Sequence, residues 1–184
     1  MDRCDWCQSD DLYRKYHDEE WGVPVHDDRK QFEFLVLESA QSGLSWITIL
    51  KKRENYRLAY DNFEPGIVAL YDDKKIDELL SNPGIIRNRR KIEASVNNAR
   101  RFLEIQKAFG SFDRYIWGFV KNQPIVNSWS NSSEVPATSP LSDTISKDLK
   151  QRGFRFLGSV TVYAHLQATG IVDDHINSCF KKTK

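Results

Sequence analysis

Four residues of the types that bind zinc lie at the two ends of the chain. His175 and Cys179 stand four positions apart, so on a helix their side chains would share one face, one turn apart. Cys4 and His17 lie near the other end, and two thiolates with two imidazoles make a complete tetrahedral zinc set. Because four protein ligands close such a site, the zinc would be structural and would join the termini rather than activate water.

The spacing alone leaves alternatives to this metal site. Cys7 lies three residues after Cys4 and competes with it as a ligand, and buried thiols with surface histidines would need no metal at all. The odd number of cysteines, 3, does not favour a disulfide framework. A zinc deaminase would combine His-x-Glu with Pro-Cys-x-x-Cys, and this combination does not occur, so we exclude that class.

Glu38 is a carboxylate within a segment, 32–40, that is apolar nearly all round a helix. A carboxylate in such surroundings is costly unless it is paired, and it often marks a site. A glutamate at the helix margin that reaches solvent is the alternative. Aromatic residues gather in the same part of the chain: Trp6, Tyr13, Tyr16, Trp21 and Trp46. A flipped nucleobase needs such faces to stack on and a carboxylate that accepts from its exocyclic amine, although each ring could also belong to the core.

A candidate hairpin for DNA lies at 79–89. Pro83, Gly84 and Ile85 match the turn of the helix-hairpin-helix motif, in which glycine lets the backbone approach a phosphate, but Ile86 stands where a second glycine is usual. Basic residues follow at once: Arg87, Arg89, Arg90 and Lys91. An ordinary connection between two helices explains the turn equally well.

Helical periodicity dominates the elements that must position these residues. We expect helices at 29–41, about 45–61, 72–80, from the Asn82-Pro83-Gly84 turn to about 108, 112–121, 142–152, 159–169 and 172–180. Asp27 or Asp28 is expected to cap the first of them and Gly43 to end it. The segment 127–141, rich in Ser, Asn, Thr and Pro, reads as a long loop. Without sustained strand alternation, the fold class is all-α.

Composition and charge restrict the class further. The 184 residues are 40% hydrophobic and 29% charged, without a run of about 18 apolar residues or a secretion signal, so we expect a cytoplasmic protein. The net charge is +1, but residues 1–46 hold eleven acidic and five basic residues, so the excess of basic residues lies further along the chain. Its basic clusters are either solvated helix faces or a surface for nucleic acid.

The chain resembles the type I 3-methyladenine DNA glycosylases of bacteria over essentially its whole length. Five blocks in the right order carry the resemblance: Arg3-Cys4-x-Trp6, Tyr16-His17-Asp18-x-Glu20-Trp21-Gly22-Val23-Pro24, Gly43-Leu44-Ser45-Trp46-Ile47-Thr48-Ile49-Leu50-Lys51-Lys52-Arg53, Gly84-Ile85-Ile86-Arg87 and Asp174-His175-x3-Cys179. The resemblance implies one unit over 1–184 with a helix-hairpin-helix glycosylase fold. The hairpin core would span about 45–125, and a zinc site would join the N- and C-terminal regions.

The resemblance also implies roles for individual residues. Structural Zn²⁺ would be bound by Cys4, His17, His175 and Cys179, which leaves Cys7 out. Glu38 would be the catalytic carboxylate that contacts the methylated base. Substrate-binding aromatics would be Tyr16 and Trp46, with Trp6, Tyr13 and Trp21 beside them. DNA would be contacted by Gly43 and Leu44, which insert toward the gap left by the flipped nucleotide, and by Gly84, Ile85, Ile86 and Arg87.

The implied activity is hydrolysis of the N-glycosidic bond of 3-methyladenine in double-stranded, alkylated DNA by a monomer. Other members of the superfamily place an essential aspartate after the hairpin; here Asp113 is the nearby candidate, and nothing around it singles it out. The type I family does without that aspartate, in agreement with the resemblance. Two alternatives stay open: a helix-hairpin-helix DNA-binding module without catalysis, and a zinc-dependent hydrolase, which would need an open metal position.

Overall fold

The computed structural model describes residues 2–183 and is mostly helical. In chain order the elements are η1 (Asp5–Cys7), α1 (Asp11–Glu19), α2 (Asp28–Gln41), α3 (Trp46–Ala59), η2 (Asp61–Phe63), α4 (Pro65–Val68), α5 (Asp73–Ser81), α6 (Arg89–Phe109), α7 (Phe112–Gly118), β1 (Ile125–Val126), η3 (Ser132–Glu134), α8 (Pro140–Gln151), α9 (Ser159–Ala168) and β2 (Val172–Asp173). Over this range no helix is long and apolar enough to cross a bilayer.

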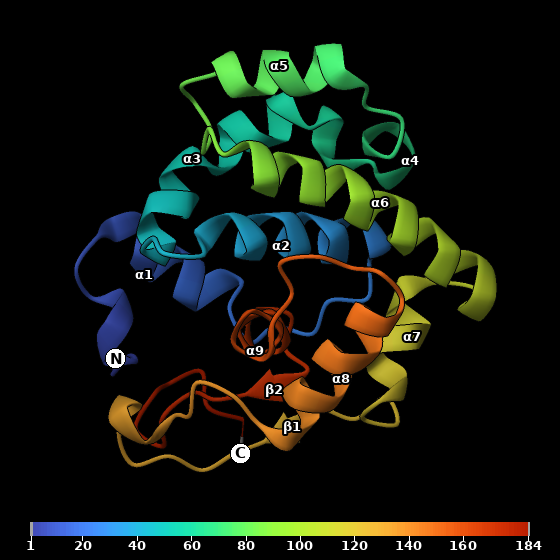
Figure 1. The fold of residues 1–184 in the computed structure, drawn as a ribbon. Helices are drawn as coiled ribbons and strands as arrows, with labels where there is room; N and C mark the ends of the chain where they lie inside the picture. Colours follow the sequence, from blue (N-terminus) through green and yellow to red (C-terminus); the bar gives the residue numbers. More distant parts are fainter. Residues whose placement is uncertain (1, 184) are drawn as a thin grey trace.

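Helix α2 forms the centre of the fold. Ten consecutive residues, 31–40, are buried, because α3 and α6 pack on one side of the helix while α7 and α9 pack on others (Figure 1). The Asp27 carboxylate accepts a hydrogen bond from the backbone N–H of Lys30 and so caps the first turn. The helix ends at Gln41, and Gly43 follows with φ +82°, a conformation that glycine adopts without strain. The predicted cap and stop of this helix are confirmed.

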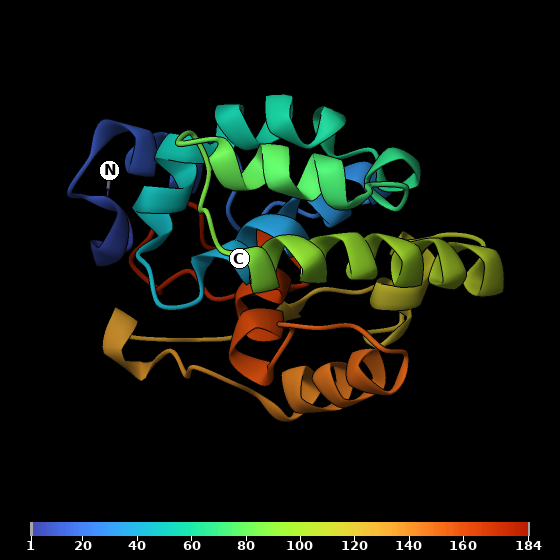
Figure 2. The same ribbon diagram turned by 45° about the horizontal axis from the view of Figure 1, so that its top comes forward.

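The two ends of the chain meet on one side of the molecule. Helices α3 to α6 form one layer and α7 to α9 the other, and the N-terminal part of the chain lies beside α3 (Figures 1 and 2). Strands β1 and β2 pair in parallel, Ile125 with Val172 and Val126 with Asp173. The N–H of Phe180 donates to the carbonyl of Asp2 at 2.9 Å, which joins the terminal segments directly.

The expected helices between 28 and 169 correspond to α2, α3, α5, α6, α7, α8 and α9, with ends that differ by a few residues. Two helices were missed. The four-residue α4 is too short for periodicity to show. Helix α1 is amphipathic but strongly charged, and it begins where the Asp10 carboxylate accepts from the N–H of Leu12.

The predicted helix at 172–180 is wrong, and with it the helical spacing of His175 and Cys179. Residues 172–173 form strand β2, and the segment after it turns without becoming a helix. Its backbone groups bond to distant segments instead of to the preceding turn: the N–H of Asn177 donates to the carbonyl of Trp129 at 2.8 Å. A tight turn, closed by the hydrogen bond from the N–H of Cys179 to the carbonyl of Ile176 at 2.9 Å, brings Cys179 back toward the N-terminal segment.

Candidate active site and metal centre

A cavity of about 360 Å³ opens where the N-terminal segment, α1, α2, α3 and α9 meet. This volume lies in the range of small-molecule sites. The cavity is lined by the predicted carboxylate Glu38 and by all five predicted aromatics, Trp6, Tyr13, Tyr16, Trp21 and Trp46. The structure therefore brings together residues that the sequence distributes over 41 positions of the first quarter of the chain.

Glu38 lies at the wall of this cavity and is almost fully buried, with 4% of its surface exposed. Burial raises the pKa of its carboxyl group from 4.5 to about 8. The alternative of a glutamate that reaches solvent at the helix margin is excluded by this burial. An empty cavity thus favours a neutral carboxylic acid at neutral pH, and a cation beside it would favour the ionised form.

The aromatic rings form two connected walls of the cavity. Tyr16 and Trp46, from α1 and α3, have ring centroids 5.6 Å apart at an interplanar angle of 54°. Trp6 packs against Tyr13 at 4.9 Å and edge-on against Trp21 at 5.0 Å. Flat apolar faces beside one carboxyl group suit a planar ring that carries a polar edge.

Sequence reasoning missed the second side of the cavity, which comes from the loop at 127–139 and from α9. Ser132, Val135 and Pro136 line it from the loop, and Gln167 lines it from α9. The buried Asp174 carboxylate holds this side together. It accepts hydrogen bonds from Trp129 Nε1 at 2.7 Å, Asn127 Nδ2 at 2.7 Å, Tyr163 Oη at 2.6 Å and Gln167 Nε2 at 2.8 Å. Loop residues without periodicity gave no indication of this role.

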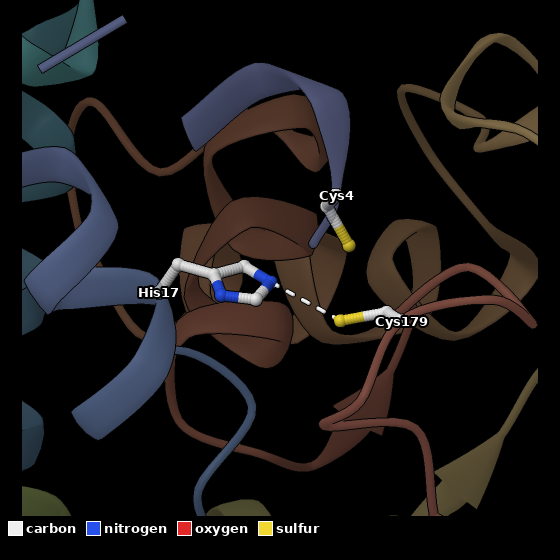
Figure 3. A group of neighbouring side chains, drawn as sticks. All are labelled: Cys4, His17 and Cys179. Atoms are coloured by element: carbon white, nitrogen blue, oxygen red, sulfur yellow. Dashed lines mark hydrogen bonds between the residues drawn. The ribbon is translucent and has the colours of Figure 1, made fainter. Parts of the chain in front are cut away.

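Three of the four predicted metal ligands form one buried group. Cys4, His17 and Cys179 point toward one another from the N-terminal segment, α1 and the C-terminal segment (Figure 3). Their ligand atoms all lie within 4.8 Å of one another, and His17 Nε2 lies 3.4 Å from Cys179 Sγ. Soft thiolates with an imidazole, brought together from distant segments, are the donor set of a structural metal site.

The fourth predicted ligand, His175, lies at the edge of this group. Its ring centroid is 5.2 Å from that of His17. Its Nδ1 lies 2.8 Å from Asp173 Oδ1, while its Nε2 is buried and has no hydrogen-bond partner within residues 2–183. His17 has the matching arrangement, with Nδ1 2.8 Å from Asp18 Oδ1. A carboxylate on the far nitrogen is the usual support of a metal-bound imidazole, so the residues fit a metal ion.

Cys7, the competing ligand, is outside the group. Its thiol is buried and donates to the carbonyl of Cys4 at 3.1 Å. The group itself adjoins the cavity, since Trp6 packs edge-on against His17 at 5.4 Å and Trp21 against His175 at 4.5 Å. Whatever fixes these imidazoles therefore also fixes Trp6 and Trp21, two of the aromatic rings that line the cavity.

The predicted hairpin lies between α5 and α6. The Ile85 side chain is 2% exposed and belongs to the core, so only its backbone can reach DNA. A Cβ on Gly84 would lie 2.9 Å from Asn82 Oδ1 and 3.0 Å from Asn55 Cβ, so the glycine is required by a close approach of α3. Ile86 is half-buried, and the Arg87 side chain is exposed on the same turn.

The turn between α2 and α3 carries Gly43 and Leu44. Both are exposed, Leu44 with 40% of its surface, and a Cβ on Gly43 would meet no other described atom within 4 Å. Asp113, in the first turn of α7, does not line the cavity. Its carboxylate oxygen Oδ1 lies 2.8 Å from His26 Nδ1.

A buried ion-pair network fixes the helices that carry the cavity residues. The Arg53 guanidinium of α3 donates to both carboxylate oxygens of Glu20, each at 2.8 Å, and to Glu33 of α2 at 2.7 Å. Its side chain is only 9% exposed. Glu20 follows the end of α1, so this one side chain connects α1, α2 and α3.

We expect Arg53→Met to lower the free energy of unfolding by about 3 kcal/mol, because it removes the most buried partner of the Glu20 and Glu33 carboxylates and leaves them to the more exposed Lys30 and Arg57. Urea denaturation of the variant beside wild type measures the loss. Arg57→Met is the matched control: Arg57 is a third exposed, and its replacement should cost less than about 1 kcal/mol. Equal losses in both variants would contradict the central role of Arg53.

Comparison with known proteins gives a consistent result. The family model described as methyladenine glycosylase matches residues 6–182. The DNA-3-methyladenine glycosylase 1 of Escherichia coli K12 is 46% identical over 179 residues, which are 97% of this chain and 96% of that protein. A crystal structure of 3-methyladenine DNA glycosylase I superposes with a TM-score of 0.96 at 46% identity, covering 99% of this chain and 100% of the other. A crystal structure of a tyrosine-to-phenylalanine variant of 3-methyladenine DNA glycosylase I, in complex with 3-methyladenine, superposes with a TM-score of 0.96 at 41% identity. The match covers 100% of this chain and 99% of the other.

Proposed function

The chain belongs to the methyladenine glycosylase family, and on that premise we propose that it excises 3-methyladenine from alkylated double-stranded DNA. The reaction is hydrolysis of the N-glycosidic bond after the damaged nucleotide has been flipped out of the duplex. The oxygen of water forms the new bond to C1′ of the deoxyribose as the bond from C1′ to N9 of the base breaks. The base leaves as neutral 3-methyladenine, and one proton of the water is released to solvent. The observation that carries the proposal is Glu38, a buried carboxyl group in a cavity walled by aromatic rings.

Glu38 gives the cavity a means to prefer a charged base. The nucleotide of 3-methyladenine is cationic, whereas that of adenine is neutral. A cation within hydrogen-bond reach lowers the pKa of Glu38, which burial holds at about 8, and the resulting carboxylate accepts from the exocyclic amine. A neutral adenine offers no such compensation, so the cavity favours the methylated base. Tyr16 and Trp46 stack on the ring.

The positive charge also explains why a second acid or base is unnecessary. The glycosidic bond of the cationic nucleotide is already weakened, and the departing base becomes neutral as it leaves. Asp113, the candidate for the superfamily's aspartate, lies outside the cavity and pairs with His26. Extrusion into a closely fitting pocket then supplies much of the rate.

The duplex is held by two exposed turns in this proposal. Gly43 and Leu44 insert toward the gap left by the flipped nucleotide. At the hairpin the N–H groups of Gly84, Ile85 and Ile86 donate to Asn82 Oδ1, the carbonyl of Asn82 and Tyr56 Oη. These bonds fix the turn that approaches a phosphate, and the exposed Arg87 supplies the positive charge for it. The hairpin belongs to a core at about 45–125 within one unit of 1–184, and the enzyme acts as a cytoplasmic monomer.

Zn²⁺ is the metal that we propose for Cys4, His17, His175 and Cys179. Bound there, it supplies a structural crosslink between the termini and no step of the reaction. Two observations support this assignment. The ligand atoms of Cys4, His17 and Cys179 lie close together, and the buried Nε2 of His175 has no hydrogen-bond partner within residues 2–183. Four protein ligands also speak against a zinc hydrolase, which needs an open position.

A DNA-binding module without catalysis is the other function class to separate. Such a module has no use for a base pocket, so binding of free 3-methyladenine distinguishes a glycosylase from a DNA-binding module. We expect 3-methyladenine to change the tryptophan fluorescence of wild type, because three of the five tryptophans line the cavity. Absence of any response to 3-methyladenine would favour the binding module.

Trp46→Ala should weaken binding of free 3-methyladenine by about 1–3 kcal/mol, since it removes one stacking face of the cavity. Trp46→Phe is the matched control and should keep most of the affinity, because it retains an aromatic face. Calorimetric titration measures both. An affinity unchanged in Trp46→Ala would remove Trp46 from the base site.

A further inference from the structure

Lys91 forms two hydrogen bonds that neither the fold class nor the base pocket accounts for. Its Nζ donates to the carbonyl of Ala40 at 2.9 Å and to the carbonyl of Ser42 at 2.7 Å. These carbonyls belong to the last turn of α2 and to the residue after it, 51 and 49 positions away in the chain. Glu38 lies two residues before the first contact, and Gly43 lies directly after the second.

The dipoles of α6 and α2 show which of the two helices the positive charge of Lys91 stabilises. Lys91 stands in the first turn of α6, just after the Asn88 cap, where a positive charge opposes the helix dipole. The carboxyl end of α2 is the opposite case, because its carbonyls lack partners within their own helix and a cation there is favourable. The position of Lys91 is therefore unfavourable for its own helix and favourable for α2.

The hairpin is attached to α3 by separate contacts. Lys52 Nζ donates to the carbonyl of Pro83 at 2.9 Å, and the N–H of Ile86 donates to Tyr56 Oη at 3.1 Å. The turn at 42–45 joins α2 to α3. With Lys91 connecting α6 to the end of α2, the turn, α3, the hairpin and the start of α6 form a closed ring of contacts. Leu44 stands exposed on that ring.

We propose that Lys91 is a positioning residue for base excision, which holds the turn that carries Gly43 and Leu44 at a fixed place relative to the hairpin. A duplex seated on the hairpin then meets this turn where the flipped nucleotide leaves its gap, and the same contact fixes the end of the helix that carries Glu38. The inference rests on the proposed function, because it assigns both turns to the duplex.

The test compares Lys91→Met with Arg90→Met. Arg90 is exposed, lies one position earlier and has the same charge, so both variants lose one positive charge at the start of α6. Single-turnover release of 3-methyladenine at saturating enzyme gives the maximal rate, and titration with duplex at several salt concentrations gives the affinity. Titration with the free base shows whether the pocket is intact, and thermal unfolding shows whether the variants are folded.

Lys91→Met should lower the maximal rate on the order of tenfold, with the affinity for free 3-methyladenine unchanged within about twofold. Arg90→Met should weaken duplex binding at low salt only and keep the maximal rate. Lys91→Arg should recover most of the rate, because a guanidinium can still donate to both carbonyls. If Lys91→Met does not fold, Lys91→Gln, which keeps one donor group, takes its place.

A wild-type maximal rate in Lys91→Met would overturn the proposal, and so would a parallel loss of free-base affinity, which would mean a general structural role. Failure of the proposed function looks different, because wild type itself would then release no base. A duplex with 2-aminopurine opposite an abasic site keeps the test independent of chemistry. Its fluorescence should respond to wild type and to Arg90→Met, and much less to Lys91→Met.

Discussion

Glu38→Gln should lose base excision on the order of a hundredfold while the protein becomes more stable at alkaline pH. The loss of activity follows because a neutral amide cannot take the negative charge that stabilises the cationic base as its bond breaks. The shape of the side chain and the aromatic walls stay the same, so the variant should still fold. Single-turnover release of 3-methyladenine from methylated duplex DNA measures the loss.

The gain in stability follows from the raised pKa of Glu38. For an acid whose pKa is higher in the folded protein, the stabilising contribution is complete below 4.5 and is lost as the pH rises through about 8. Glutamine has no proton to lose, so it avoids a penalty that reaches on the order of 5 kcal/mol above pH 9. The melting temperature of Glu38→Gln should exceed that of wild type by about 10 °C at pH 9 and by little at pH 5.

Either half of this result can contradict the account of Glu38. Equal melting temperatures at pH 9 would show that the carboxyl group is solvated or paired in solution. Full excision activity of Glu38→Gln would show that no negative charge is needed beside the base. Loss of activity without any gain in alkaline stability would keep the catalytic role and remove the raised pKa from its explanation.

Removal of the proposed metal should have the second large effect. We expect one equivalent of zinc per chain, and a strong chelator should lower the melting temperature by about 10 °C or more, because the proposed ion would join the N-terminal segment, α1 and the C-terminal segment. Free-base binding should fall at the same time, since Trp6 and Trp21 pack directly against the two imidazoles. Elemental analysis and thermal unfolding measure these changes.

Two cysteine variants provide the matched comparison. Cys179→Ser should lose the zinc and most of the stability that it supplies. Cys7→Ser should keep a full equivalent, because among the described residues the buried Cys7 thiol bonds to the carbonyl of Cys4 and lies outside the ligand group. Zinc loss in Cys7→Ser would make Cys7 a ligand. A protein that binds no zinc, or one that keeps its melting temperature in chelator, would leave the cluster as buried thiols and histidines without a metal.

Most of the fold could be predicted from the sequence because its helices are long and regularly periodic. Helix α2 is the clearest case, because a capping aspartate, a run of mostly apolar residues and a terminal glycine specify both ends. Of the two carboxylates in that run, Glu38 faces the cavity and Glu33 pairs with Arg53. The aromatic residues were recognised as a group because they gather within a short stretch of chain. The resemblance to a known family then related those residues to the two distant ligands at the C-terminus.

The remainder depends on contacts between distant segments. His175 and Cys179 suggested a helix by spacing, but pairing of β1 with β2 and the four donors around Asp174 hold that segment extended. The loop at 127–139 has no periodicity, so its place along the cavity is determined by those same contacts. Lys91 looked like one more basic residue of the hairpin, and only the fold brings the end of α2 within reach of its ammonium group.

The most direct test of the central claim is a time course of bases released from methylated duplex DNA by the folded, zinc-loaded protein. Chromatography separates free 3-methyladenine from 7-methylguanine and adenine. We expect rapid release of 3-methyladenine and none of adenine. Release of 7-methylguanine should be much slower, because its nucleotide is also cationic but presents a carbonyl oxygen, not an amine, to Glu38. No release of 3-methyladenine, or release of all three bases at similar rates, would contradict a pocket in which Glu38 selects a cationic adenine.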